Sequence, residues 1–312
     1  MKISIIEPLG ITEEEAEKLQ AEYAPGCELV YHNAKPADAA EKAARAKGAD
    51  IVMLANTPLP ASVLDAAPSV KFLSVAFTGV DHVAMDACHE KGITVSNCSG
   101  YANEAVSELA IGMAIALYRK LAACDKAVRG GKDRTGLLGL ELSGKTFGVI
   151  GAGAIGQKTM ALAKAFGCKV LAYNRHKKDI PGVTFVTLDE LLAASDIVSL
   201  HVPLTDATRG LIGASELAKM KASAILINTA RGPVVESAAL ADALNEGSLA
   251  GAAVDVFEHE PPMEEGHALL HAKNILLAPH IGFATKEALQ KRAVIAFQNI
   301  AAYLKGTPQN VM

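Results

Sequence analysis

Residues 145–167, KTFGVIGAGAIGQKTMALAKAFG, decide the fold of this chain. An apolar run, Thr146–Ile150, leads into the motif G-x-G-x-x-G, and a helical pattern follows at once. A second apolar run, Lys169–Tyr173, completes a strand–helix–strand unit, which is the context that gives the motif its meaning. The glycines are Gly151, Gly153 and Gly156. In such a unit they permit a tight turn, the approach of a pyrophosphate to the backbone, and close helix–strand packing, so the stretch predicts a dinucleotide at the helix N-terminus.

The same alternation continues outward to both ends of the chain. Short apolar runs alternate with alanine-rich helical segments, which is typical of βαβ units and parallel sheets. Before the motif, the predicted strands are Ile3–Ile6, Leu29–Tyr31, Ile51–Leu54, Phe72–Phe77 and Ile93–Ser96. From the motif onward they are Thr146–Ile150, Lys169–Tyr173, Asp196–Leu200, Ala224–Ala230, Gly251–Val256 and Ile275–Ala278. The pattern predicts an α/β fold with two series of parallel strands.

A change of composition separates the two series. A long helix is predicted from Asn103 to Val128, and a polar, glycine-rich passage, GGKDRTGLLGLELSGK, follows it. A last helical segment, from about Thr285 to Lys305, has no strand after it. This order fits a domain of residues 100–285 inserted within a domain built from residues 1–99 and 286–312.

Composition excludes several function classes. The chain has 312 residues and a net charge of −4, with the two signs interspersed, so neither a nucleic acid nor an anionic membrane is expected as a partner. Glu7 and Pro8 interrupt the start before a signal-peptide core forms, and the apolar stretch Leu109–Tyr118 is too short to span a bilayer. We therefore expect a cytoplasmic protein. Five scattered cysteines fit its reducing environment: Cys27, Cys88, Cys98, Cys124 and Cys168.

Three polar residues follow apolar runs in the last third of the chain. Arg231 comes after AILINTA, Glu260 after AAVDVFEH, and His280 ends ILLAPH. Ligands bind at such strand-to-loop junctions. Arginine grips a carboxylate with two parallel hydrogen bonds, histidine moves a proton near neutral pH, and a carboxylate stabilises the charged ring. Together they suit a substrate with a carboxylate beside a carbonyl, although each alone also fits a surface or loop position.

His267 and His271 lie four residues apart and invite a metal interpretation. No third ligand lies nearby at a convincing spacing, so we expect no metal and a polar helical turn before the strand at Asn274–Pro279.

The end of the second motif strand bears on cofactor choice. Sites for NAD usually carry Asp or Glu there to bind the ribose hydroxyls. This chain has Asn174, which removes the negative charge that would repel a 2′-phosphate, and then Arg175, His176 and Lys177, which could bind that phosphate. The run favours NADP over NAD; alternatively it is a solvated loop and NAD is used.

Taken together, the chain resembles the D-isomer-specific 2-hydroxyacid dehydrogenase family over essentially its whole length. The matching strings are FTGVDHVAMDA (77–87), GYANEAVSELA (100–110), GVIGAGAIG (148–156), LHVPLTDATRGLI (200–212), NTARGPVV (228–235), DVFEHEPP (255–262) and APHIG (278–282). The resemblance implies two Rossmann-like, doubly wound domains flanking a cleft, with the nucleotide domain inserted in the substrate domain, and a homodimer.

The resemblance also implies roles for individual residues. Arg231 would bind the substrate carboxylate, His280 would act as acid/base, and Glu260 would be its partner. Asp255 would contact the nicotinamide side, and His201 would lie by the adenosine half. The predicted cofactor-binding residues are Gly151, Ala152, Gly153, Ala154, Ile155, Gly156, Asn174, Arg175, His176, His201, Val202, Pro203, Thr208, Thr229, Ala230, Arg231, Asp255, His280 and Gly282. The predicted substrate-binding residues are Asn56, Thr78, Gly79, Val80 and Tyr101; Phe77 and Tyr101 fit core packing equally well.

Glu260 indicates whether a proton is transferred together with the hydride, a point on which related dehydrogenases differ. The formate dehydrogenase branch has Gln at this position and transfers hydride without a proton relay. A Glu–His pair therefore predicts that a proton moves with the hydride, as the reduction of a 2-oxo acid to a D-2-hydroxy acid requires.

The substrate is predicted from the loop Ala55–Leu59, which resembles that of glycerate dehydrogenases and of hydroxypyruvate or glyoxylate reductases. Small polar oxo acids are favoured and pyruvate is second. A short phosphoglycerate dehydrogenase remains an alternative, although the arginine common in members acting on phosphorylated substrates is missing from the loop. Phosphite oxidation and a dinucleotide-sensing corepressor without enzyme activity are further alternatives.

Overall fold

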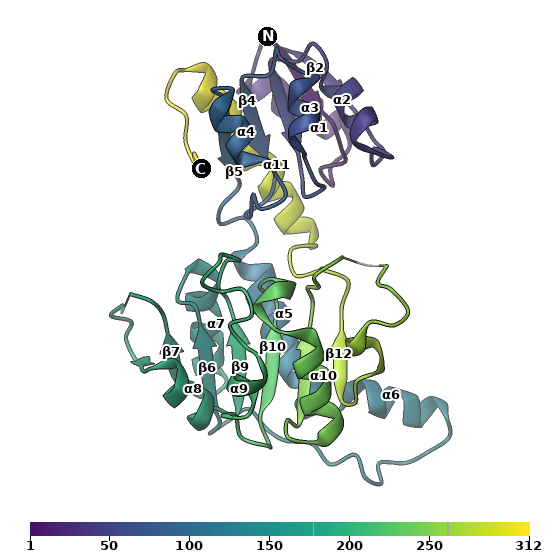
Figure 1. The fold of residues 1–312 in the computed structure, drawn as a ribbon, viewed down its shortest axis with the longest axis vertical. Helices are drawn as coiled ribbons and strands as arrows, with labels where there is room; N and C mark the ends of the chain where they lie inside the picture. The colour runs from purple at the N-terminus through teal and green to yellow at the C-terminus, as the bar shows by residue number, and fades with distance from the viewer. Residues whose placement is uncertain (177, 261) are drawn as a thin grey trace. The chain divides into compact units, whose positions relative to one another are not determined.

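The fold is described from a computed structural model, which covers residues 1–176, 178–260 and 262–312. The chain forms two compact units (Figure 1). Unit 1 comprises Met1–Ala102 and Ala284–Met312, and unit 2 comprises Asn103–Phe283. The boundaries expected from the sequence, 99/100 and 285/286, stand two or three residues from these positions.

Unit 1 is built on five parallel strands in the order β2-β1-β3-β4-β5. The strands are β1 (Lys2–Ile5), β2 (Glu28–Tyr31), β3 (Ile51–Leu54), β4 (Phe72–Val75) and β5 (Thr94–Asn97). The helices are α1 (Glu13–Tyr23), α2 (Ala39–Ala46), α3 (Ala61–Asp65), α4 (Met85–Glu90) and α11 (Lys286–Leu304). Every residue of β3 and β4 is buried, as is typical of central parallel strands.

Helix α11 belongs to unit 1 although it lies near the end of the chain. The buried residues Ala293, Phe297 and Ile300 lie three or four apart, so they share one side of the helix. Ser74 of β4 donates a hydrogen bond from its hydroxyl to the Ala296 carbonyl at 2.9 Å. The two ends of the chain therefore fold together.

Unit 2 has seven parallel strands in the order β12-β11-β10-β9-β6-β7-β8. They are β6 (Thr146–Ile150), β7 (Lys169–Tyr173), β8 (Thr184–Phe185), β9 (Ile197–Leu200), β10 (Ile225–Asn228), β11 (Gly251–Val254) and β12 (Ile275–Leu277). The α-helices are α5 (Asn103–Tyr118), α6 (Leu121–Arg129), α7 (Ala154–Ala165), α8 (Leu188–Ala194), α9 (Ala214–Leu217) and α10 (Ser237–Glu246). Two short 3-10 helices are η1 (Gly232–Val234) and η2 (Ala268–His271).

Two hydrophobic clusters cover the faces of the unit 2 sheet. One unites Phe147 and Val149 of β6 with residues of α5 and α7. The other unites Ile150 with residues of α8 and α10, and Figure 1 shows α5 and α10 on opposite sides of the sheet. Strand order reverses at β6, which has β7 on one side and β9 on the other. The prediction of two parallel-sheet α/β domains is confirmed.

The single long helix predicted from Asn103 to Val128 is wrong. The chain breaks after Tyr118 because Lys120 adopts a left-handed conformation (φ 51°), and a new helix, α6, begins at Leu121. The Leu140 amide donates to the Tyr118 carbonyl at 2.9 Å and so satisfies a carbonyl at the end of α5. Apolar periodicity alone cannot reveal this long-range cap.

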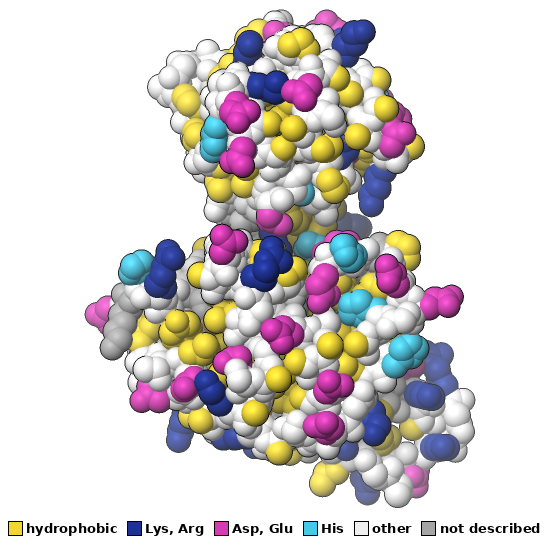
Figure 2. All heavy atoms as spheres, viewed as in Figure 1, with side chains coloured by type: hydrophobic (Ala, Val, Ile, Leu, Met, Phe, Trp, Pro, Cys, Tyr) yellow, Lys and Arg dark blue, Asp and Glu magenta, His cyan; other side chains and the backbone are white. Residues whose placement is uncertain are grey.

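The helices and the surface add two further observations. Among the described residues, no helix combines the length and the apolar character needed to cross a membrane. On the face seen in Figure 2, lysine and arginine side chains are interspersed with carboxylates.

Candidate functional site

The glycine loop after β6 packs closely against its protein neighbours at Gly151 and Gly156 and is open at Gly153. Gly151 has φ 102°, and a Cβ there would lie 2.4 Å from the His201 carbonyl oxygen. A Cβ on Gly156 would lie 2.0 Å from the Gly151 carbonyl oxygen, so α7 packs directly on the loop. A Cβ on Gly153 would meet nothing within 4 Å, and this residue is the N-cap of α7 and makes no side-chain capping bond. The loop thus offers an open backbone and free N–H groups, which fit a pyrophosphate.

The end of β7 lies against this loop. Asn174 accepts a hydrogen bond from the Ala152 N–H at 3.0 Å and donates to the His176 carbonyl at 2.7 Å. Arg175 and His176 are exposed, and Lys177 lies outside the described residues. Lys178, which the sequence analysis did not identify, donates from Nζ to the Ala152 carbonyl at 2.9 Å and brings a cation to the loop.

The carboxyl end of β9 contributes a neutral ring. Burial lowers the pKa of His201 to about 4, and its Nε2 lies 2.9 Å from the Ser199 hydroxyl. The hydroxyl of Thr208 donates to the Pro203 carbonyl at 2.7 Å, so it is engaged within its own loop. Because β6 and β9 flank the reversal of strand order, this edge is where an α/β sheet binds a nucleotide.

A buried asparagine shapes the turn that carries Arg231. Asn228, at the end of β10, is 1% exposed; its Nδ2 donates to the Arg231 carbonyl and its Oδ1 accepts from the Ala230 N–H. Arg231 is itself extended (φ −149°), and its guanidinium donates to the Ala230 carbonyl at 2.8 Å. A Cβ on Gly232 would lie 2.0 Å from the Phe257 carbonyl carbon, so the turn lies directly on the loop after β11. Asn228 thus holds this turn, and the sequence analysis did not identify it.

Asp255 holds the turn that carries His280. It is 1% exposed, and its two carboxylate oxygens accept from the N–H groups of Ile281 and Gly282 at 2.8 and 2.7 Å. Burial raises the pKa of Asp255, while these two hydrogen bonds oppose the shift. His280 has φ 55°, a rare conformation for a non-glycine residue, and the Asp255 bonds hold the backbone just after it.

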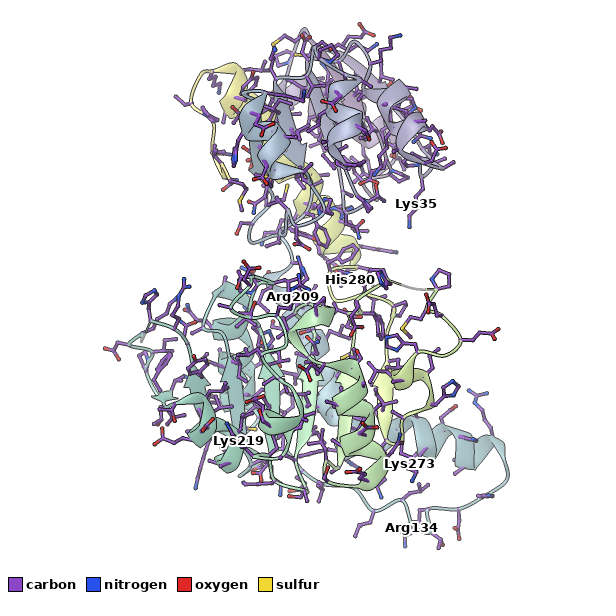
Figure 3. All side chains as sticks on the ribbon, viewed as in Figure 1. Lys35, Arg134, Arg209, Lys219, Lys273 and His280 are labelled. Carbon is purple, nitrogen blue, oxygen red and sulfur yellow. The ribbon has the colours of Figure 1, made fainter. Side chains whose placement is uncertain are left out.

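His280 and Glu260 form a close pair. The His280 Nδ1 lies 2.8 Å from a Glu260 carboxylate oxygen, and the ring packs edge-on against Phe283 with 5.6 Å between the ring centroids. His280 is labelled in Figure 3. Strands β10, β11 and β12 are parallel neighbours, so Arg231, Glu260 and His280 all follow carboxyl ends at the same edge of the sheet. The pair leaves Nε2 as the ring nitrogen that faces away from Glu260.

The remaining predicted cofactor residues lie on the same loops of unit 2. Thr229 and Ala230 are both 8% exposed and belong to the turn before Arg231. A Cβ on Gly282 would lie 2.9 Å from an Asp255 carboxylate oxygen. Ala154 and Ile155 begin α7.

The predicted substrate residues all belong to unit 1. Asn56 is exposed in the loop after β3, and the Thr78 carbonyl accepts from Asn97 Nδ2 at 2.7 Å. Gly79 and Val80 are half-buried in the loop after β4. Tyr101 is 2% exposed, packs near Phe77, and lies 5.8 Å from the Arg292 guanidinium, which places it in the interior of unit 1.

The two histidines near η2 have separate hydrogen-bonding partners. His267 Nε2 lies 3.3 Å from Glu258, and His271 Nε2 lies 3.0 Å from the Glu265 carbonyl oxygen, so the rings have different partners. Over residues 1–176, 178–260 and 262–312, no group of three or more His, Cys, Asp or Glu side chains is placed to hold a metal ion.

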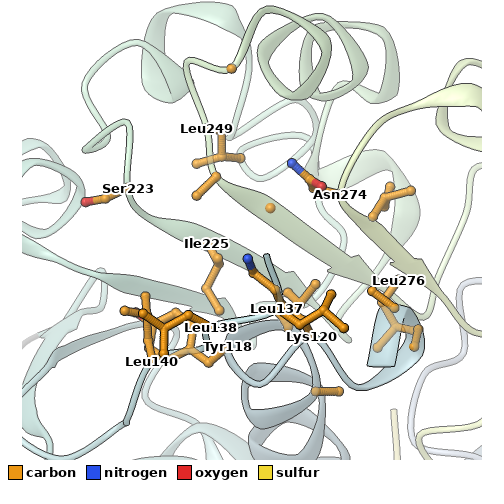
Figure 4. A pocket seen from close by; sticks show the side chains of 18 of the residues that line it. Tyr118, Lys120, Leu137, Leu138, Leu140, Ser223, Ile225, Leu249, Asn274 and Leu276 are labelled. Carbon is orange, nitrogen blue, oxygen red and sulfur yellow. The ribbon is translucent and has the colours of Figure 1, made fainter. Parts of the chain in front are cut away.

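A cavity of about 730 Å³ opens at the opposite edge of the unit 2 sheet (Figure 4). Ile225, Gly251 and Ile275, the first residues of β10, β11 and β12, line it. Leu137 and Leu138, from the segment after α6, contribute further apolar wall. The cavity therefore lies at the amino ends of the strands that carry Arg231, Glu260 and His280 at their carboxyl ends.

Known proteins resemble this chain in sequence and in fold. A family model described as "D-isomer specific 2-hydroxyacid dehydrogenase, NAD binding domain" matches residues 111–282. The chain is 42% identical to a glyoxylate reductase of Thermofilum pendens over 90% of the chain and 86% of the relative. It is 37% identical to a hydroxypyruvate reductase of Blautia hydrogenotrophica over 91% of both. A solved acyclic imino acid reductase in complex with NADPH and D-Arg matches 100% of both chains at 29% identity, with a TM-score of 0.91.

Proposed function

Because the chain belongs to the D-isomer-specific 2-hydroxyacid dehydrogenase family, we propose that it reduces a small 2-oxo acid to the D-2-hydroxy acid with its own Arg231, Glu260 and His280. It is an NAD(P)-dependent oxidoreductase. The observation that carries the assignment of residues is the His280–Glu260 pair, 2.8 Å apart at the sheet edge where Arg231 also follows a strand.

The proposed mechanism assigns one task to each side chain. Arg231 binds the substrate carboxylate through its guanidinium and fixes the carbonyl beside it. The reduced nicotinamide, when bound, supplies a hydride to the carbonyl carbon. His280 donates a proton from Nε2 to the carbonyl oxygen, which becomes the hydroxyl, and Glu260 on Nδ1 stabilises the protonated ring and fixes its orientation. Asp255 and Asn228 act behind these residues by holding the two turns.

Glyoxylate and hydroxypyruvate are the proposed substrates, and pyruvate is second. Supporting this choice, relatives covering most of the chain are glyoxylate reductases, a hydroxypyruvate reductase and a glycerate dehydrogenase. The loop after β3 presents Asn56, a small polar residue, and no arginine.

The experiment that tests the function is a substrate panel. Purified protein is mixed with NADPH or NADH and with glyoxylate, hydroxypyruvate, pyruvate or phosphohydroxypyruvate, and loss of the reduced-nicotinamide absorbance is followed. We expect turnover with the first two acids and the D-isomer as product where the product is chiral. A cofactor bound without turnover of any oxo acid would favour a sensing role instead.

We propose NADPH as the preferred cofactor, supported by the cations Arg175 and Lys178 and by Asn174 in place of a carboxylate. Arg175→Ala should raise KM for NADPH about ten- to a hundredfold, the loss of one hydrogen bond to a charged group, and leave KM for NADH nearly unchanged. Lys169→Ala, at the opposite end of β7, is the matched control. Equal effects of Arg175→Ala on both cofactors would remove the assignment.

We propose that a second copy of the chain covers the segment from α6 to Leu140, giving a homodimer. Helix α6 has no buried residue, while Val128 is 75% and Leu138 90% exposed. The double substitution Val128→Asp with Leu138→Asp should convert the dimer to monomer in light scattering, whereas Phe166→Asp, at an exposed apolar residue elsewhere, should not. A monomeric unmodified protein, or a dimer that survives the double change, would contradict the proposal.

We place the protein in the cytoplasm, in keeping with five cysteines that are all free thiols.

A further inference from the structure

A buried carboxylate grips the loop that carries Asn56. Glu7 follows β1 and is 1% exposed. One of its oxygens accepts hydrogen bonds from the N–H groups of Ala55 and Thr57, at 2.5 and 3.2 Å, and the other contacts the Thr57 hydroxyl. The two amides flank Asn56, so Glu7 fixes the backbone on both sides of it while the Asn56 side chain stays exposed.

A buried lysine binds the same loop at Pro58. Lys42 of α2 is 4% exposed, and its Nζ donates to the Pro58 carbonyl. Burial lowers the pKa of Lys42, and the nearby Glu7 carboxylate opposes that shift. Burying two ionisable groups is costly unless they are hydrogen-bonded, and here both are engaged by one short loop.

The loop after β4 is joined to this loop by its backbone. The Leu59 N–H donates to the His82 carbonyl at 2.7 Å, the Ala84 N–H donates to the Leu59 carbonyl at 3.0 Å, and Leu59 pairs with Val83 in a parallel bridge. By holding Ala55 and Thr57, Glu7 therefore also helps to fix the loop after β4, which contains Gly79 and Val80.

We propose that Glu7 is a positioning residue for substrate binding: its carboxylate holds Asn56 and the linked loop after β4 in the arrangement that receives the 2-oxo acid. The proposal rests on the proposed function. Glu7 binds the two amides that flank Asn56, a predicted substrate-binding residue. Small displacements of a substrate-binding side chain lower both affinity and rate.

The test compares Glu7→Gln with a carboxylate at the other end of the same sheet. Asp50 accepts from the Lys2 N–H at 2.7 Å where β1 and β3 begin, so Asp50→Asn removes a similar bond far along the strands from Asn56. Thr57→Val, which removes only the hydroxyl contact, is the second variant should Glu7→Gln fold poorly. For each, KM and kcat are measured with glyoxylate and NADPH, and exchange of the amides of residues 55–58 is followed without substrate.

We expect Glu7→Gln to raise KM for glyoxylate about tenfold, Thr57→Val to raise it less, and both to leave KM for NADPH within about twofold. The amides of Ala55 and Thr57 should exchange faster in Glu7→Gln and not in Asp50→Asn. An unchanged KM for glyoxylate in an active Glu7→Gln enzyme, or an equal rise in Asp50→Asn, would overturn the proposal. If the unmodified protein reduces no oxo acid, the proposed function is refuted instead. If amide exchange is also unchanged in Glu7→Gln, the claim that Glu7 holds the loop of residues 55–58 is refuted as well.

Discussion

Replacing His280 with Asn should lower kcat for oxo acid reduction by about 10²–10⁴-fold, because proton transfer from a positioned side chain contributes that much. Asn is the sharper replacement, since it tolerates the left-handed backbone (φ 55°) that His280 adopts, whereas His280→Ala adds backbone strain to the loss of the ring. Steady-state kinetics with glyoxylate measure the loss. Binding of NADPH, followed by its fluorescence, should be nearly intact.

Two comparisons make this result specific. His89→Ala removes an exposed histidine of α4 and should leave kcat unchanged. Glu260→Gln keeps a hydrogen-bonding partner beside Nδ1 but removes its charge, so it should reduce kcat less than His280→Asn does. Turnover of His280→Asn close to that of the unmodified enzyme would dispose of the acid/base role.

Replacing Arg231 with Ala should lower kcat/KM for glyoxylate by about 10²–10³-fold, because a desolvated guanidinium–carboxylate pair is lost. Arg231→Lys retains the charge but not the two parallel donors, and should recover only part of the loss. Both are measured against oxo acid concentration at saturating NADPH. If the kcat/KM of Arg231→Lys equals that of the unmodified enzyme, charge alone suffices and binding through two parallel hydrogen bonds is wrong. If Arg231→Ala keeps the KM of the unmodified enzyme for glyoxylate, the substrate carboxylate is bound elsewhere.

The glycine loop and the residues at the strand ends could be predicted from the sequence because short stretches of sequence determine them. Gly151 is required by its own positive φ of 102°, and Gly156 by the carbonyl of Gly151 five residues earlier, so the motif encodes both. Arg231, Glu260 and His280 were found from the apolar runs before them. Several predicted strands ran one or two residues too long, as at Ala230 and Val256, because these apolar residues stay buried although the strands have already ended.

The residues that hold the site were not accessible in the same way. Glu7 meets Ala55 across 48 residues, and Lys178 meets Ala152 across 26. Asn228 lies inside an apolar run, where its type alone does not reveal that both ends of its amide are used by the next turn. The break after Tyr118 likewise depends on Leu140. The contacts of Glu7, Lys178 and Tyr118 join distant positions, and periodicity carries no information about such contacts.

The most direct test of the account is a crystal structure of the protein with NADPH and oxamate, an unreactive analogue of a 2-oxo acid. We expect the oxamate carboxylate to bind the Arg231 guanidinium and its carbonyl oxygen to lie within hydrogen-bonding reach of His280 Nε2, about 2.6–3.2 Å, with Glu260 still on Nδ1. Oxamate bound away from Arg231, or a His280 ring turned so that Nε2 faces Glu260, would contradict it.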